Sequence, residues 1–111
     1  AVIQASLAPK SVTTPIAMGI AEKIGGLPSL TAVLVIFTGI LGAALGPALL
    51  RRAGLRDPAG NGFAMGIAAH GVGTARAFQL NEQSGAFAAL AMGLNGLFTA
   101  VLLPAVAHWL L

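Results

Sequence analysis

The chain has 111 residues, of which 57% are hydrophobic and 8% are charged, and its formal net charge is +3. Soluble domains carry about 25% charged residues, because a water-facing surface needs them. Six basic and three acidic side chains are too few for such a surface, so we interpret the chain as an all-α integral membrane protein. The basic residues are not interleaved with aromatic residues, which argues against a nucleic-acid partner, and the lack of cysteine excludes disulfides.

The first segment, residues 1–24, is long enough to span a bilayer but is interrupted by "APKSVTTP". Pro9 and Pro15 remove backbone donors, so we predict a broken helix with halves at residues 1–8 and 15–24. The next segment, residues 28–50, carries no charge and predicts a continuous transmembrane helix.

The loop "RRAGLRDPAGN", residues 51–61, holds three of the six basic residues, and the positive-inside rule places it in the cytoplasm. Residues 61–82 are again long and apolar but contain "HGVGT". Because glycine weakens a helix, Gly71 and Gly73 predict a second broken helix, with halves at residues 61–70 and 75–82. Non-helical backbone at membrane depth survives only when it is buried in protein or lines a cavity.

The last segment, residues 84–111, predicts a second continuous transmembrane helix, with Trp109 as an interfacial anchor. If all four segments span, both chain ends lie on the cytoplasmic side with the arginine loop. The whole chain is then one transmembrane domain, multi-pass in the inner (cytoplasmic) membrane. The start in mid-segment leads us to expect the C-terminal half of a longer membrane protein.

An internal repeat is suggested by a shift of 60 residues, which aligns Thr14 with Thr74 and Glu22 with Glu82. Ala and Val matches carry little weight in this composition, whereas the glutamate pair carries more because the chain has only three acids. The pattern would be broken helix, whole helix, broken helix, whole helix.

Each predicted break precedes a new half-helix, for which Thr14 and Thr74 are the expected N-caps. A helix N-terminus offers free N–H groups and partial positive charge, and a full cation lies beside each break, Lys10 and Arg76. Transporters use this arrangement to hold an anionic substrate near the bilayer midplane. The predicted substrate-binding residues are Lys10, Ser11, Thr13, Thr14, His70, Gly71, Gly73, Thr74 and Arg76, with His70 able to carry or sense a proton.

Structural alternatives stand beside these functional interpretations. Arg76 can snorkel to an interface or pair with Glu82, and Lys10 can lie at the membrane surface. A lone histidine such as His70 is more often packed and satisfied by a carbonyl, and Asn95 is expected to join helices.

Small residues recur at helical spacing, which lets helices approach closely. They form two GxxxG pairs and one stripe: Gly42 with Gly46, Gly62 with Gly66, and Ala89, Gly93, Gly96 and Ala100. Two distant histidines and three acids do not form a metal-ligand set, and no nucleophile–base pair indicates an enzyme. We therefore expect no metal and no cofactor.

The runs "PKSVTTPIA" and "HGVGTARA", with "GAFAALAMGLNGLFTAVLLP", are similar to the LrgB/CidB family of bacterial membrane proteins. The resemblance covers nearly the whole chain, and it implies two functions. One is an antiholin-like regulator of murein hydrolase export and autolysis that works with a small LrgA/CidA-type membrane partner. The other, implied by a plastidic glycolate/glycerate carrier and by links of bacterial relatives to pyruvate, is transport of small monocarboxylates.

A carrier of small organic anions is the function that the broken helices and their cations favour, with the regulator as the alternative. The expected partners are the anion, the lipid bilayer and the small membrane protein, and a homo-oligomer is left open. Nucleic acid is not expected.

Overall fold

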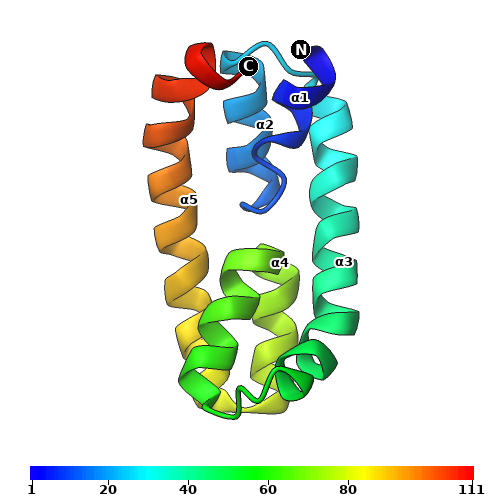
Figure 1. The fold of residues 1–111 in the computed structure, drawn as a ribbon, viewed down its shortest axis with the longest axis vertical. Helices are drawn as coiled ribbons and strands as arrows, with labels where there is room; N and C mark the ends of the chain where they lie inside the picture. Colours follow the sequence, from blue (N-terminus) through cyan, green and yellow to red (C-terminus); the bar gives the residue numbers. More distant parts are fainter.

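The structure is a computed structural model that describes all residues, 1–111, and every regular element in it is a helix. In chain order the helices are α1 (Val2–Leu7), α2 (Thr14–Lys23), α3 (Pro28–Arg52), α4 (Pro58–Leu80) and α5 (Glu82–Leu110). In Figure 1, α3 and α5 are the two long helices that run the length of the molecule, with α1 and α2 between them at one end and α4 between them at the other. The expected all-helical fold is therefore confirmed.

The two long helices, α3 and α5, are the ones suited to a membrane. Both α3 and α5 are long and apolar enough to cross a bilayer, and only 11% and 17% of their most hydrophobic windows are buried inside the protein. Large apolar side chains such as Phe37 on α3 and Phe98 on α5 are 61% and 57% exposed. Because a water-facing surface rarely carries so much apolar area, these faces are suited to lipid.

Helices α1 and α2 form a hairpin, here called the N-terminal hairpin, joined by residues 8–13. The Ser6 hydroxyl accepts a hydrogen bond from Leu27 N at 2.8 Å, and Thr31 Oγ1 donates to Ser6 O at 2.8 Å. Gly26, just after α2, lies so close to the Ala5 backbone that a Cβ would meet it at 2.8 Å. The end of α2 and the start of α3 therefore both lie beside α1, and the hairpin enters and leaves at one end of the molecule.

Helix α4 also folds back on itself. As a straight helix its 23 residues would span about 34 Å. Yet Ser84 Oγ, just beyond its end, donates to the carbonyl of Pro58, its first residue, at 2.7 Å. The reversal occurs at Ala69 (φ −130°, ψ 17°) and His70 (φ 43°, ψ −130°), the two residues with non-helical backbone. We call this element the α4 hairpin (Figure 1).

The predicted position of this second interruption was wrong in detail. The glycines of "HGVGT" do not unwind the helix, because Gly71 and Gly73 already belong to its second arm. Gly73 is instead required for close packing of the two arms, since a Cβ there would meet Met65 O at 2.5 Å and Ala69 Cβ at 2.6 Å. The positive φ falls on a histidine, which the sequence pattern did not indicate.

The expected sidedness was also wrong. Because each hairpin returns to the end it starts from, only α3 and α5 run the length of the molecule (Figure 1). A cavity at one end is lined by both Ala1 and Leu111, whereas Arg51 and Arg56 line a cavity with Asn81 at the opposite end. The two chain ends are thus on the face opposite the arginine loop.

Glycines fix the α4 hairpin against α5. A Cβ on Gly62 would collide with the Ser84 backbone, and one on Gly66 would collide with the Ala88 backbone. This is the close helix approach predicted for the Gly62–Gly66 pair. A Cβ on Gly42 of α3 would lie 2.5 Å from Ala69 Cβ, whereas Gly93 faces open space. The predicted stripe on the last helix therefore packs only in part.

Candidate functional site at the hairpin tips

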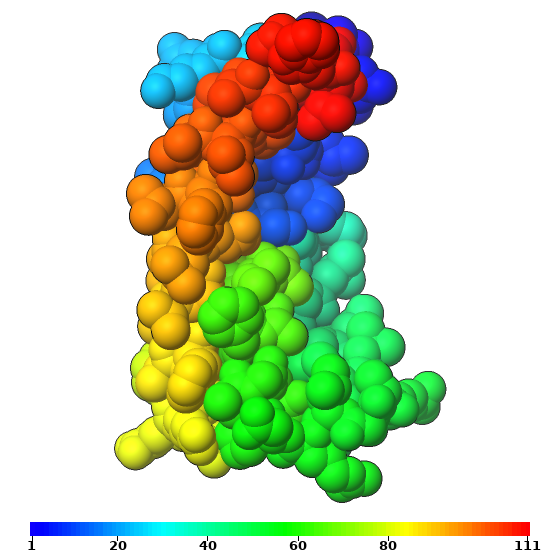
Figure 2. Space-filling view, turned by 60° about the vertical axis from the view of Figure 1, so that its left-hand side comes forward, coloured from blue at the N-terminus to red at the C-terminus, as the bar shows by residue number.

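The tips of the two hairpins meet near the middle of the molecule. In Figures 1 and 2 the turn after α1 lies directly above the tip of α4. Asn95, near the middle of α5, joins them: its Nδ2 donates to Ser11 O at 3.3 Å and to Ile67 O at 3.2 Å. Its Oδ1 accepts from Thr99 Oγ1 at 3.2 Å. The predicted helix-joining role of Asn95 thus takes the specific form of a bridge between the two tips.

His70 is 4% exposed, and it fastens the α4 tip to α3. Its Nε2 lies 2.9 Å from Val35 O, and its ring fills the space beside Gly39, where a Cβ would approach it at 2.8 Å. His70 is thus packed and satisfied by a carbonyl, as the structural alternative to a proton carrier predicts. The hydrogen bond holds a residue whose positive φ is otherwise unfavourable for a side chain with a Cβ.

The threonines differ from the prediction. The N-cap of α2 is Thr13 rather than Thr14, which is its first helical residue, and neither side chain caps the helix. Thr74 lies inside the second arm of α4, where its Oγ1 donates to His70 O at 2.8 Å, so its assignment as an N-cap was wrong. A hydroxyl that bonds back to the carbonyl four residues earlier is already satisfied and cannot serve the helix N-terminus.

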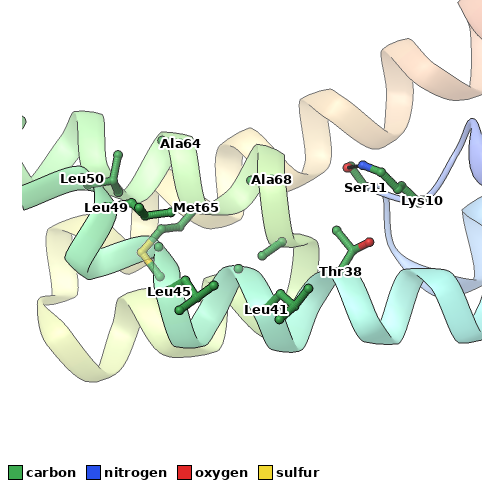
Figure 3. Close-up of a pocket in the computed structure, with 13 residues that line it drawn as sticks. Lys10, Ser11, Thr38, Leu41, Leu45, Leu49, Leu50, Ala64, Met65 and Ala68 are labelled. Carbon is green, nitrogen blue, oxygen red and sulfur yellow. Dashed lines mark hydrogen bonds between the residues drawn. The ribbon is translucent and has the colours of Figure 1, made fainter. Parts of the chain in front are cut away.

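Lys10 and Ser11 lie together at the tip of the N-terminal hairpin, where Lys10 Nζ donates to Ser11 Oγ at 3.2 Å. Both line one end of a groove of about 540 Å³ between α3 and the first arm of α4. Figure 3 shows this polar end, which Thr38 completes, and leucine side chains along the rest of the groove. Lys10 is half-buried, which places a full cation at the depth where the tips meet.

Arg76 lies away from this meeting point, two turns along the second arm of α4. Its Nη1 donates to Gln79 Oε1 at 3.4 Å, so the predicted alternative of a pair with Glu82 is not formed. Of the two predicted cations, only Lys10 lines the groove.

Both half-helices that leave the tips do so with their N-termini at the tips. Helix α2 begins at Thr14 and runs toward one face, and the second arm of α4 begins after His70 and runs toward the other. Because the first N–H groups of a helix lack intrahelical partners and carry partial positive charge, each tip offers free N–H groups beside the carbonyl end of the arm that arrives there. No group of histidine and acidic side chains anywhere in the chain could hold a metal ion.

Sequence reasoning missed the residues that anchor the hairpins: Ser6, Thr31, Val35, Gly39 and Ser84. A serine within an apolar segment is the only signal that could have indicated Ser6, since a buried hydroxyl needs a partner.

Comparison with known proteins places the chain in a family. The LrgB-like family matches residues 1–109. The chain belongs to the LrgB-like family. Among its relatives, the uncharacterized protein YwbG of Bacillus subtilis is 43% identical over 99 residues, which are 89% of this chain and 44% of that protein.

Two named relatives are more distant. The holin-like protein CidB of Staphylococcus epidermidis is 35% identical and the antiholin-like protein LrgB of Bacillus cereus is 36% identical, each over 89% of this chain and 43% of the relative. The LrgB-family chain thus spans less than half the length of the relatives it matches. No solved structure matches it.

Proposed function

We propose that this LrgB-family chain works in the inner membrane, as a multi-pass protein, as an antiholin-like regulator of murein hydrolase export and autolysis. The names of two relatives, holin-like CidB and antiholin-like LrgB, support this function. The partner would be a small LrgA/CidA-type membrane protein. Exposed small residues suited to helix association, Gly93 above all, offer it a contact surface.

A second candidate is carriage of small organic anions such as glycolate, glycerate or pyruvate. The observation that favours it is the meeting of two hairpin tips, each with a helix N-terminus, at mid-depth beside Lys10. Interrupted helices whose N-termini face a substrate near the midplane are typical of secondary transporters. In this proposal each hairpin acts as one broken helix, and the two halves of the chain are inverted repeats.

Within the carrier proposal, Lys10 contributes the full charge and Ser11 a hydroxyl. The backbone of Thr13, Thr14, Gly71 and Gly73 contributes N–H groups, while His70 and Thr74 hold the α4 tip in place. Arg76 acts at longer range, because six residues of helix place it about 9 Å from His70 along the axis.

The two functions are separated by uptake of labelled glycolate, glycerate and pyruvate into proteoliposomes that contain the protein, with and without its partner. For the carrier we expect saturable uptake that Lys10→Gln abolishes and that Arg76→Gln lowers less. Lys23→Gln, which removes an exposed cation at the end of α2, is the matched control.

For the regulator we expect no uptake of any of the three anions. Instead, Gly93→Leu should release the partner on co-purification and alter lysis, whereas Gly19→Leu, also in open space but on α2, should not. Normal uptake by a well-inserted Lys10→Gln protein would contradict the proposed anion site, and retention of the partner by Gly93→Leu would contradict the contact surface.

A further inference from the structure

Two cavities of the chain lie next to each other along α3 and share part of their lining. The groove described above runs from Lys10 and Ser11 past Leu41, Leu45 and Leu49 to Leu50 and Met65. Leu50 and Met65 also line a second cavity, of about 200 Å³, at the end of the molecule that carries the arginine loop. The two neighbouring cavities are here called the channel, which extends from the hairpin tips to that end.

The wall of this channel is apolar over most of its length. From Leu41 to Leu50 it follows α3 for about 13 Å, at the helical rise of 1.5 Å per residue. The leucines of α3 face Ala64, Met65 and Ala68 of α4 across it (Figure 3). Leu45 and Leu49 are 54% and 61% exposed, so this wall lies open toward the hydrocarbon that surrounds α3.

The character of the channel changes at its outer end. Arg51 and Arg56 line the second cavity, and both are exposed, without a hydrogen bond to any other side chain of the protein. The nearby acid, Asp57, is engaged as the N-cap of α4, where its Oδ2 accepts from Gly60 N at 3.2 Å. The guanidinium groups are therefore available to an anion.

We propose that this channel binds an anionic glycerophospholipid such as phosphatidylglycerol. One acyl chain lies in the leucine-lined groove, and the phosphate is held by Arg51 and Arg56. Basic pockets between transmembrane helices are suited to anionic headgroups. The occupant has to be apolar at one end and anionic at the other, and an anionic phospholipid meets both requirements.

The two arginines lie away from the hairpin tips, although the groove that holds the acyl chain ends at Lys10 and Ser11 of the proposed anion site. The chain provides a matched control as well. Arg52 neighbours Arg51 in the last turn of α3 and is also exposed, but it does not line either cavity. A diffuse attraction to anionic lipid would not distinguish Arg52 from its neighbours, whereas a bound headgroup would.

The test is native mass spectrometry of the purified protein with phosphatidylglycerol, phosphatidylcholine of the same acyl chains, and soluble glycerol 3-phosphate. We expect phosphatidylglycerol to bind about tenfold more tightly than phosphatidylcholine. The pair Arg51→Gln and Arg56→Gln should abolish that preference, while Arg52→Gln should preserve it. Equal losses from Arg52→Gln and from the pair would overturn the proposal.

A second pair of variants tests the groove. Leu45→Trp should block the acyl chain and weaken binding, whereas Ile40→Trp, at a similarly exposed position of α3 outside the groove, should not. Unchanged binding by Leu45→Trp would show that another segment or protein fills the groove. Binding of glycerol 3-phosphate as tight as that of the lipid would show a site for free anions instead, and either result overturns the proposal.

Discussion

The N-terminal hairpin turns through residues 8–13, whereas α4 turns within Ala69 and His70. The first is fastened by side-chain hydrogen bonds through Ser6 and by a buried apolar cluster that includes Ile20 of α2 and Val35 of α3. The second is fastened by backbone contact with α5 at Gly62 and Gly66. A loop thus allows a turn without strain in an element held by side-chain contacts, while close glycine packing holds a tight turn at the cost of one residue with positive φ.

The largest effect should come from filling the glycine contact. Gly66→Ala places a methyl group against the Ala88 carbonyl, and overpacking of this kind costs about 3 kcal/mol of unfolding free energy. Denaturant titration in detergent micelles measures it. Gly93→Ala, in open space on α5, is the control and should be neutral or slightly stabilising. Equal stability of the two variants would remove the distinction between the hairpins.

The next effect concerns the tight turn itself. His70→Ala loses the hydrogen bond to Val35 O and the ring beside Gly39 but keeps the positive φ, so we expect a loss of about 2 kcal/mol. His70→Gly loses the same contacts but relieves the backbone, so it should be the more stable of the two. The same titration compares them, and the reverse order would show that the turn is not strained.

A smaller and more local effect is expected at the N-terminal hairpin. Ser6→Ala leaves Leu27 N without its acceptor and should cost about 1.5 kcal/mol. Hydrogen exchange should quicken in α1 while α4 keeps its protection. Ser29→Ala, at an exposed position of α3, is the control. Equal quickening in both hairpins would show that they unfold as one unit.

The smallest effect on stability is expected where the hairpins are joined. Asn95→Leu removes both bonds to the tips, and hydrogen bonds between membrane helices contribute about 0.6 kcal/mol each. The distribution of distances between spin labels at Gly19 and Ala75 should become broader in this variant. Thr99→Val, which removes only the bond to Asn95 Oδ1, should leave the distance distribution narrow. An unchanged distance in Asn95→Leu would show that the tips do not depend on the bridge.

Hydropathy and proline positions were sufficient to predict the helical class and the two long helices α3 and α5, because the length of an uninterrupted apolar segment alone decides those elements. The interruptions lie within the segments predicted to contain them, but the return of each hairpin to its own face was not predictable. It depends on contacts between distant residues, such as Ser84 with Pro58 and Leu27 with Ser6. The internal repeat stays a prediction.

The candidate site was predicted less well for a related reason. Residue type indicated Lys10, which lines the groove, but it also indicated Thr74 as a helix cap and Gly71 as an unwinding residue. The sequence alone does not distinguish a threonine that caps a helix from one whose hydroxyl donates to a carbonyl four residues earlier in the same helix. The partner carbonyl decides between them, and it is known only from the fold.

The meeting of the hairpin tips at mid-depth also has an electrical consequence. Within the proposed membrane-spanning arrangement, a charge at the tips, such as that of Lys10 or of the carrier proposal's anion, lies about halfway through the membrane potential. Moving one elementary charge across the whole membrane changes its energy by about 2.3 kcal/mol per 100 mV, so arrival at the tips changes it by about 1.1 kcal/mol. Occupancy of the tips by an anion should therefore respond to voltage about sixfold per 100 mV, with opposite sign from the two faces.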